Sequence, residues 1–394
     1  MDIRFSPEDS QFREQVRQWL YENAPTEPRP PMHDLVASRA FDAAWQRKLF
    51  EAGWAGIAWP KEYGGLGLSL TRQLIWYEEY ARSSAPPVGV ESILFVALAH
   101  AGPTLIYSGT EAQKSFHLPK ILSGEAVWCQ GFSEPSSGSD LGSLKTRAVI
   151  DGDHLVVNGQ KVWTSRADVS DYQELLVRTD PDAPKHKGIT WVICDMSSPG
   201  ITVRPITNMS GTAEFCEVFY DDVRIPLSNV VGGLNNGWRT AMSTLSFERG
   251  TAFIADQVQL DKDIDALIEL ARSKTMSDGR KAIAHDDLAQ RLMTLRAECN
   301  ALRAMTYMDV SRNMQSDLPG AEGSMTRLYY SKMCQRVGRL LMDILEGEGL
   351  QRMGKHHLGI EHYLYNYAAT IGAGTEQIQR SIIAERILGL PKAR

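Results

Sequence analysis

The chain has 394 residues, of which 43% are hydrophobic and 23% are charged. This length exceeds what one ordinary hydrophobic core supports, so we expect two or three domains packed together. The formal net charge of -6 gives no reason to expect nucleic acid or an anionic membrane as a partner, and local Arg or Lys residues must hold any anionic substrate.

The first part of the chain is expected to be helical. Ser6 followed by Pro7 predicts a helix start, and Phe12, Val16 and Leu20 recur at helical spacing. We therefore expect an N-terminal helical domain over residues 1–125. No apolar N-terminal segment follows a basic stretch, and no apolar run is long enough to cross a bilayer. This predicts a cytoplasmic protein without a membrane partner.

The apolar period changes to two between about residues 126 and 232. The dipeptide Asn158-Gly159 between two apolar runs predicts a two-residue β-hairpin. A small central β-barrel is expected over 126–232. Further strands are predicted at Glu174–Arg178, Ile189–Asp195, Ile201–Ile206 and Cys216–Tyr220.

Helical spacing returns after Trp238, with long helices predicted at Asp261–Arg272 and Leu288–Met308. An apolar stripe within the second helix is typical of a core or a subunit contact; its members are Leu292, Leu295, Cys299 and Leu302. We expect a C-terminal domain of the four-helix-bundle type over residues 233–394. The predicted fold class is thus α+β.

Five cysteines are scattered along the chain without C-x-x-C spacing, and the histidines form no cluster with zinc-ligand spacing. Buried free thiols are the expected state of these cysteines: Cys129, Cys194, Cys216, Cys299 and Cys334. The sequence therefore predicts no metal site.

The stretch from Gln130 to Ser165 is the most informative one. It contains the loop Q-G-F-S-E-P-S-S-G-S-D and ends in N-G-Q-K-V-W-T-S. The face of Trp163 offers apolar contact, and hydroxyl groups beside it can satisfy the polar atoms of a ring. Such a combination suits a flat heterocycle that forms hydrogen bonds.

Seven segments in the same order resemble the acyl-CoA dehydrogenase family across nearly the whole chain. They read W-P-K-E-Y-G-G-L-G-L-S, G-T-E-A-Q-K, F-S-E-P-S-S-G-S-D, N-G-Q-K-V-W-T-S, D-D-V-R-I-P, L-S-F-E-R-G and G-T-E-Q-I-Q-R-S-I-I-A-E-R-I-L-G-L-P. The resemblance implies an FAD-dependent flavoprotein of fatty acid or lipid catabolism that acts on an acyl-CoA. It also implies an electron-transfer flavoprotein as electron acceptor, and a dimer or tetramer with identical or related subunits.

The resemblance carries several site residues. It places Trp163 against the isoalloxazine, Ser165 near its N5 edge, and Ser139 where the loop closes on cofactor and substrate. The residues that it implies for FAD are Gln130, Phe132, Ser133, Ser139, Trp163, Thr164, Ser165, Thr375 and Gln377.

The segments that hold the FAD diphosphate in many family members differ in this chain. A-R-S-K-T-M-S-D-G-R-K replaces the R-x-x-F-G pattern, so the residues for the diphosphate and the adenine stay unassigned. D-I-L-E-G-E-G-L places Asp343 and Glu346 where a Gln and a Gly are common. Anions beside a diphosphate are unfavourable unless they point away from it.

A second departure concerns the catalytic base, because Ala373 stands where many members have a Glu. Removing the α-proton of a thioester needs a carboxylate whose pKa is raised by desolvation. One branch of the family, which includes isovaleryl- and long-chain acyl-CoA dehydrogenases, takes this base from a Glu-Arg pair. That pair matches Glu248 and Arg249, so we expect Glu248 to be the base and Arg249 to face the CoA arm. The backbone N–H of Ala373 is expected to polarise the thioester oxygen.

The expected reaction is the dehydrogenation of an acyl-CoA to the 2,3-enoyl-CoA. Two alternatives remain open: a non-catalytic structural subunit of a mixed tetramer, and an acyl-CoA oxidase. The sequence leaves the acyl group open as well, whether linear, branched or sterol-derived.

Overall fold

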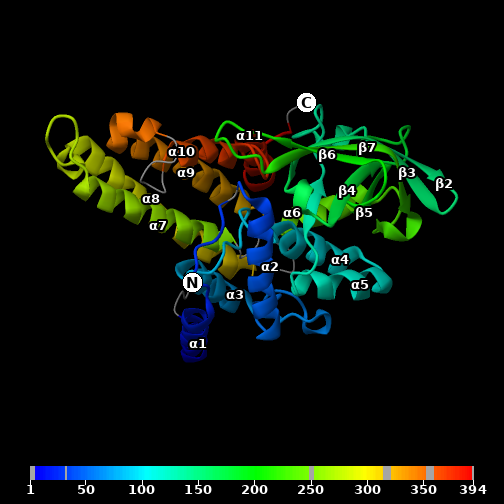
Figure 1. The fold of residues 1–394 in the computed structure, drawn as a ribbon, viewed down its shortest axis with the longest axis horizontal. Helices are drawn as coiled ribbons and strands as arrows, with labels where there is room; N and C mark the ends of the chain where they lie inside the picture. Colours follow the sequence, from blue (N-terminus) through cyan, green and yellow to red (C-terminus); the bar gives the residue numbers. More distant parts are fainter. Residues whose placement is uncertain (1–4, 32, 248–252, 314–320, 352–358, 393–394) are drawn as a thin grey trace.

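The computed structural model describes residues 5–31, 33–247, 253–313, 321–351 and 359–392. Helices, then strands, then helices follow one another along the chain (Figure 1). This order confirms the α+β class that the sequence predicts.

The N-terminal helices are α1 (Pro7–Asn23), α2 (Leu35–Glu51) and α3 (Leu70–Arg82). The hydroxyl oxygen of Ser6 accepts a hydrogen bond from the N–H of Asp9 at 3.1 Å, which confirms the predicted N-cap. Helices α1 and α3 pack against each other. Their shared core contains Phe12, Val16, Leu20, Trp45, Leu49, Ile75 and Trp76.

A second helical layer covers one face of the sheet. It consists of the π-helix η2 (Val96–Ala101), α4 (Gly102–Ser108) and α5 (Glu111–Leu122). Leu105 and Ile121 from this layer pack with Trp128 and Trp191 from the strands and with Phe132, which follows β1. Figure 1 shows α4 and α5 beneath the central strands.

The central domain is one eight-stranded sheet with the order β6-β7-β3-β2-β4-β5-β8, and β1 pairs in parallel with β4. The buried side chains of these strands form their own core around Leu155, Leu175, Val192 and Val218. The strands are β1 (Trp128–Gly131), β2 (Arg147–Asp151), β3 (His154–Ser165), β4 (Tyr172–Arg178), β5 (Ile189–Asp195), β6 (Ile201–Ile206), β7 (Phe215–Pro226) and β8 (Val230–Val231).

The hairpin predicted at Asn158-Gly159 is wrong, because β3 runs without interruption through both residues. The hairpin turn instead lies at Gly152, where φ is +60° and Asp151 pairs with His154. Gly159 is needed for a different reason: a Cβ there would lie 2.7 Å from the Thr146 hydroxyl oxygen. The glycine marks a close approach of two segments and a register shift in the sheet rather than a turn.

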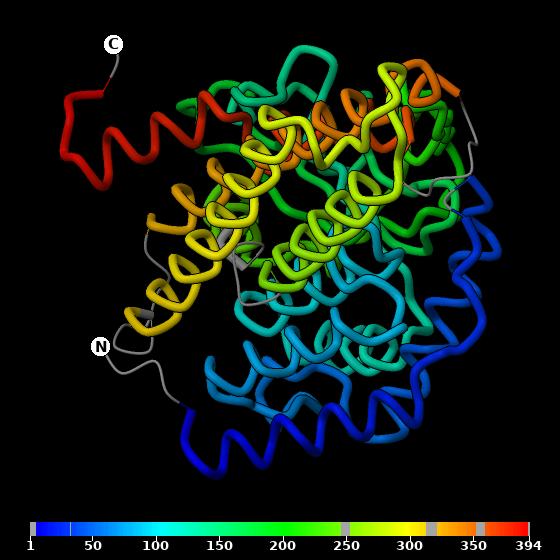
Figure 2. Tube along the Cα trace, turned by 90° about the vertical axis from the view of Figure 1, so that its left-hand side faces the viewer, coloured from blue at the N-terminus to red at the C-terminus, as the bar shows by residue number. Residues whose placement is uncertain are grey.

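The C-terminal helices are α6 (Gly237–Phe247), α7 (Phe253–Ser273), α8 (Asp286–Asn313), α9 (Gly323–Leu345), α10 (Ile360–Tyr365) and α11 (Glu376–Ile382). Helices α7, α8 and α9 pack together (Figures 1 and 2). The predicted stripe is confirmed as core, since Leu292, Leu295, Cys299 and Leu302 are all buried between these helices. In Figure 2 the segment of α11 and η9 (Ile383–Ile387) extends from the body of the molecule.

All five cysteines are buried and free, as the sequence predicts. In the part of the chain that the structure describes, no helix has both the length and the apolar character needed to span a membrane.

Candidate functional site

Trp163 has an unusual position near the end of β3. Its φ is +60°, a conformation that is rare for residues other than glycine, and it lies at a register shift between Lys161 and Thr164. The indole is 58% exposed and meets the ring of Phe215 edge-on at 6.0 Å between centroids. The bulge therefore turns a large aromatic face outward instead of burying it in the sheet.

The hydroxyl-rich loop lies directly beside this tryptophan. The N–H of Val162 donates a hydrogen bond to the carbonyl oxygen of Ser133 at 2.9 Å. Phe132 is buried, whereas Ser139 is exposed farther along the loop. The structure thus brings Ser133 together with Trp163, Thr164 and Ser165, which the sequence separates by 30 residues or more.

A buried ion pair that our sequence reasoning did not single out supports this loop. The Lys161 ammonium donates to the Phe132 carbonyl oxygen at 3.0 Å and to the Glu134 carboxylate at 2.8 Å. Glu134 also accepts from the N–H groups of Lys145 and Thr146. Burial lowers the pKa of Lys161 to about 8. Burial alone would raise the pKa of Glu134, but Lys161 brings it below its usual value.

The side chain of Gln130 points into a second polar cluster. Its amide donates to Glu174 at 2.8 Å and lies 3.1 Å from Nδ1 of His100. His100 belongs to the π-helix η2, a form that often occurs at functional sites, and its Nδ1 lies 3.2 Å from Glu174. Strand β1 therefore carries a partly buried polar side chain that contacts the π-helix.

The predicted base and its neighbour, Glu248 and Arg249, lie outside the described residues. Helix α6 is described as far as Phe247 and is fixed to the second helical layer by a hydrogen bond of 2.8 Å between the hydroxyls of Thr104 and Thr244. The chain is described again from Phe253.

The C-terminal site residues lie at the start of α11. Ala373 is exposed and has φ of +55°, and its carbonyl oxygen accepts from the Gln379 amide at 3.1 Å. Thr375 caps α11 by accepting from the N–H of Ile378, and Gln377 is exposed. The structure describes no hydrogen bond or ring contact between these residues and Trp163. Within one chain they form a separate group.

The acidic residues of the segment D-I-L-E-G-E-G-L form ion pairs and hydrogen bonds within the chain. Asp343 pairs with Arg291 at 2.6 Å, and Glu348 pairs with Lys274 at 2.6 Å. The Glu346 carboxylate accepts from both the N–H and the hydroxyl of Ser277. These three carboxylates are therefore satisfied by groups of the same chain.

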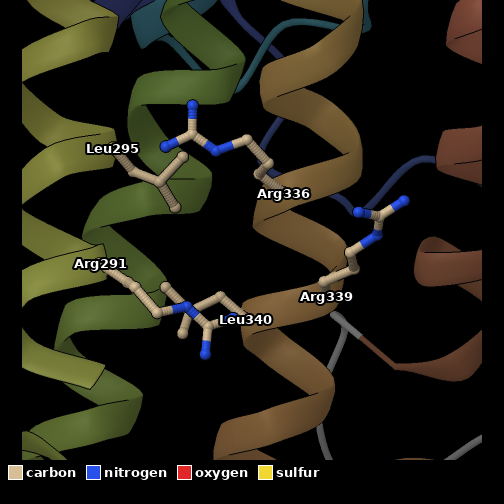
Figure 3. A pocket seen from close by; sticks show the side chains of 5 residues that line it. All are labelled: Arg291, Leu295, Arg336, Arg339 and Leu340. Carbon is tan, nitrogen blue, oxygen red and sulfur yellow. The ribbon is translucent and has the colours of Figure 1, made fainter. Parts of the chain in front are cut away.

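Arg291 also lines a cavity of about 170 Å³ between α8 and α9. It is lined by Arg291, Leu295, Arg336, Arg339 and Leu340; in Figure 3 the Arg336 side chain points toward Leu295, whereas the Arg339 side chain points away from it. Arg336 is paired with Glu298. The cavity is far in sequence from Trp163 and belongs to the bundle rather than to the hydroxyl-rich loop.

The residues around Trp163 fit a flavin ring. The exposed indole offers a flat apolar face, and the buried hydroxyl of Thr164 has no hydrogen-bond partner among the described residues. Such an orphaned polar atom beside an exposed aromatic ring is what a planar heterocycle with polar edges would satisfy. The acidic segment itself supplies no cation for the diphosphate, and its carboxylates are held by groups of their own chain.

Comparison with known families gives matches along almost the entire chain. Acyl-CoA dehydrogenase, N-terminal domain, matches residues 6–125; the middle domain matches 129–223; and the C-terminal domain matches 235–388.

Individual relatives agree with these matches. Acyl-CoA dehydrogenase IpdE1 of Mycobacterium tuberculosis is 39% identical over 390 residues, covering 97% of this chain and 98% of that protein. Among solved structures, the Tcur3481-Tcur3483 steroid ACAD has a TM-score of 0.83 at 30% identity and 100% coverage of both chains. The ChsE4-ChsE5 complex from Mycobacterium tuberculosis has a TM-score of 0.83 at 31% identity, also with 100% coverage of both chains.

Proposed function

The chain belongs to the acyl-CoA dehydrogenase family, and from this membership we propose that Glu248 is its catalytic base and that Trp163 packs on its flavin. The protein is an FAD-dependent oxidoreductase that converts an acyl-CoA thioester into the 2,3-enoyl-CoA. FAD, when bound, accepts the β-hydride. The residues of the chain orient the thioester, exclude water and remove the α-proton.

The outward-turned Trp163 is the observation that carries the flavin assignment. A tryptophan with more than half of its surface exposed, at a bulge that a left-handed residue creates, implies a partner for its face. Ser133, Thr164 and Ser165 lie around it and supply hydroxyl groups for the polar atoms of the ring. The Lys161–Glu134 ion pair keeps the backbone of Ser133 in place.

We assign Glu248 as the base because position 373 has no carboxylate. Ala373 has no acidic group, and Glu248 follows directly on α6, which is packed against the layer that carries His100. A backbone donor survives replacement of a Glu by Ala, so the N–H of Ala373 retains the role of polarising the thioester oxygen. Arg249 is assigned to the CoA arm.

Replacing Glu248 tests the proposed function. Glu248→Gln preserves shape and removes the proton acceptor, so turnover should fall by about 10²–10⁴. Flavin content and affinity for the thioester should stay close to those of the wild type. The exposed Glu269→Gln is the matched control and should keep full activity. Near-normal turnover of Glu248→Gln would contradict the assignment.

A double variant tests whether the two positions face the same carbon. Glu248→Ala combined with Ala373→Glu should regain part of the activity that Glu248→Ala loses. Recovery need not be complete, because a displacement of about 1 Å can cost on the order of 10²-fold. A flavin-loaded double variant as inactive as Glu248→Ala would argue against a shared site.

The acidic segment favours a second arrangement, in which the chain is one subunit of a mixed oligomer. Asp343, Glu346 and Glu348 stand in this segment as acidic residues, so we propose that a related chain supplies the diphosphate contacts across the boundary. The C-terminal segment also exposes Leu388 and Leu390, which suits burial against another chain. Electrons would pass from the reduced flavin to an electron-transfer flavoprotein.

Purification discriminates the two arrangements. A chain that forms a homo-oligomer by itself should be yellow and active with acyl-CoA and an artificial acceptor. A chain that needs a related subunit should be colourless alone and should gain flavin on co-expression with that subunit. Stable colourless protein in both cases would contradict the flavin assignment.

A further inference from the structure

The short turn that carries Ala373 is held by the side chain of Gln379. Ala373 has φ of +55°, and Gly374 has φ of +86°. The Gln379 amide donates to the carbonyl oxygens of Ala373 at 3.1 Å and of Gly374 at 3.3 Å. Since Gln379 is only 1% exposed, this contact is shielded from water. The C-terminal side of the turn is therefore anchored to α11.

Arg327 of α9 holds the N-terminal side of the same turn. Its guanidinium donates to the carbonyl oxygens of Ala369 at 3.3 Å and of Gly372 at 3.4 Å. The guanidinium lies 5.9 Å from the centroid of the Tyr330 ring on the same helix. Burial raises the pKa of Asp256 on α7, and the positive charge of Arg327 acts in the opposite direction. The arginine thus links the turn to helices α7 and α9.

Helix α9 contacts this part of the chain at two further points. The Gln335 amide donates to the Thr370 hydroxyl oxygen at 3.0 Å. The Lys332 ammonium lies 3.8 Å from the Glu376 carboxylate. Three side chains of one long helix therefore hold residues 369–376, and the contact from Arg327 lies nearest to Ala373.

The hydrogen bond from Arg327 to Gly372 fixes the direction of a neighbouring N–H group. The carbonyl of Gly372 and the N–H of Ala373 belong to one planar peptide unit and point in opposite directions. A donor on the Gly372 oxygen therefore turns the Ala373 N–H away from Arg327. Ala373 is exposed, and its N–H has no hydrogen-bond partner in the part of the chain that the structure describes. The turn thus presents a free donor.

The sequence around this donor makes such an anchor necessary. Gly372 and Gly374 flank Ala373, and glycine permits many more backbone conformations than other residues. Without a fixed carbonyl, the peptide between residues 372 and 373 could rotate and turn its N–H elsewhere. A donor for an oxyanion is effective only when it already points to the position where the charge develops.

We propose that Arg327 is a positioning residue for the dehydrogenation: through the Gly372 carbonyl it aims the Ala373 N–H at the thioester oxygen. This inference rests on the proposed function, because that function gives the N–H its acceptor. Arg327 itself does not contact the thioester. Its effect is on the polarisation of the carbonyl group and hence on the ease with which the α-proton leaves.

Two substitutions test the proposal on the enzyme purified with any subunit that accompanies it. Arg327→Met keeps the length of the side chain and removes every donor, whereas Arg327→Lys keeps the charge and a donor. The probes are hexanoyl-CoA, isovaleryl-CoA and 3-cyclohexylpropanoyl-CoA, each with ¹³C at the thioester carbon. Arg327→Met should lower kcat by about 10- to 100-fold with little change in KM, because the lost interaction strengthens in the transition state. Arg327→Lys should recover part of this loss.

The infrared carbonyl stretch of the bound, labelled probe is the direct readout. A hydrogen bond from the Ala373 N–H lowers this frequency relative to the free thioester. Arg327→Met should lose most of the shift, and Arg327→Lys should keep part of it. A purely structural role would reduce thermal stability or flavin content without changing the shift of the bound probe. The exposed Arg224→Gln, whose arginine pairs with Asp151, is the control and should keep the wild-type rate and shift.

Three results would overturn the inference: wild-type kcat in Arg327→Met, an unchanged carbonyl shift in that variant, or no shift in the wild type. A wild type that oxidises a probe would keep the proposed function in each of these cases. If no probe is oxidised, the proposed function fails, and the carbonyl shifts of the bound probes still decide the role of Arg327. If Arg327→Met does not fold, Arg327→Lys decides it. The shift in Arg327→Lys should then lie below the wild-type value, because lysine lacks the planar fork of arginine, and an equal shift would contradict the proposal.

Discussion

At the scale of single residues, the site depends on backbone conformations that side chains rarely adopt. Trp163, Arg166 and Ala373 all have φ between +55° and +60°. Each such conformation costs on the order of 1 kcal/mol, so neighbouring contacts must hold it. Trp163 and Arg166 lie three residues apart at the end of β3. At this end of the strand the Trp163 side chain points outward, and the Arg166 side chain, three residues later, is buried.

Trp163→Ala removes the aromatic face, whereas Ser165→Ala removes one hydrogen bond of about 1 kcal/mol. We expect the tryptophan variant to lose much more flavin than the serine variant. The ratio of flavin to protein absorbance after gel filtration measures this difference. Equal flavin content in the wild type and Trp163→Ala would show that the indole has only a packing role.

Burial raises the pKa of Asp256 on α7 to about 7, and this makes stability depend on pH. Between about pH 4 and pH 7 the unfolded chain has released this proton while the folded chain retains it, so stability falls as the pH rises through this window. Asp256→Asn should abolish this part of the slope and stabilise the protein at pH 8, by on the order of 4 kcal/mol at most. Thermal unfolding from pH 4 to pH 8 measures the slope. The exposed Asp287→Asn should leave it unchanged.

At the scale of elements, strand β3 positions the hydroxyl-rich loop through the buried ammonium group of Lys161. The Lys161 side chain is fully buried and binds both Phe132 and Glu134, so the strand fixes the two residues on either side of Ser133. The loop therefore has one preferred geometry before any ligand binds.

Lys161→Met should destabilise the protein by about 3–5 kcal/mol, because it leaves the Glu134 carboxylate buried without its cation. The double variant Lys161→Met with Glu134→Gln should recover much of this loss, since no buried charge remains unpaired. Chemical denaturation of both variants and of Glu134→Gln completes the cycle. A double variant as unstable as the sum of the single variants would contradict this account.

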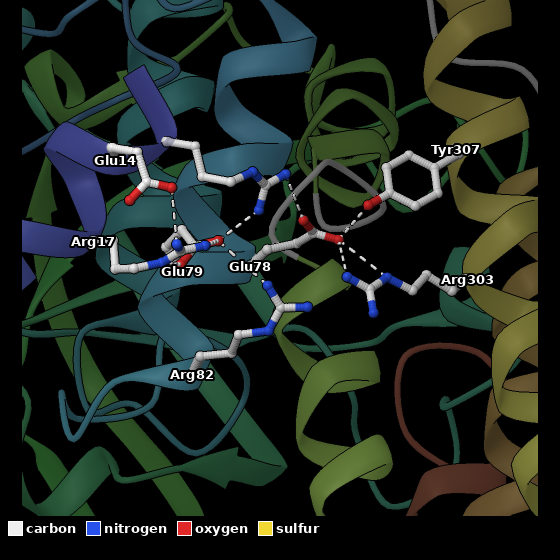
Figure 4. Close-up of polar contacts among 8 residues, drawn as sticks. Glu14, Arg17, Glu78, Glu79, Arg82, Arg303 and Tyr307 are labelled. Carbon is white, nitrogen blue, oxygen red and sulfur yellow. Dashed lines mark hydrogen bonds and ion pairs between the residues drawn. The ribbon is translucent and has the colours of Figure 1, made fainter. Parts of the chain in front are cut away.

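At the scale of the whole molecule, a charged junction fastens the N-terminal helices to the C-terminal bundle (Figure 4). Glu78 is 1% exposed and accepts from Arg13 at 2.9 Å, from Arg303 of α8 at 2.6 Å, and from the Tyr307 hydroxyl. Burial alone would raise the pKa of Glu78, but these donors bring it below its usual value. The junction therefore contributes stability above pH 4.5, and this contribution is lost as the pH falls below that value.

Glu78→Gln should lower the unfolding temperature markedly, corresponding to about 3 kcal/mol at pH 7, because two arginines lose their buried counter-charge. The difference between variant and wild type should shrink as the pH falls below 4.5. Glu14→Gln is the matched control, since Glu14 pairs with Arg17 on the surface and should matter by less than about 1 kcal/mol. Equal effects of both substitutions would contradict a structural role for the junction.

Much of this architecture could be predicted from local patterns. The period-two segments became β4, β5, β6 and part of β7, and the helical segments became α7 and α8. The Asn-Gly hairpin failed because the dipeptide signals a turn only where no neighbouring segment competes, and here Thr146 requires the glycine. Lys161 was not recognised as buried, since its partner Glu134 lies 27 residues earlier.

The junction at Glu78 also constrains how the chain can fold during synthesis. Glu78 and Arg303 are 225 residues apart, so the carboxylate leaves the ribosome long before its partner. At about 5–20 residues per second the delay is roughly 10 to 45 s. During that interval Arg13 of α1 is the cation beside Glu78, and the two donors from α8 are still absent. Closure of so long a loop is slow, so we expect the junction to be completed late in folding.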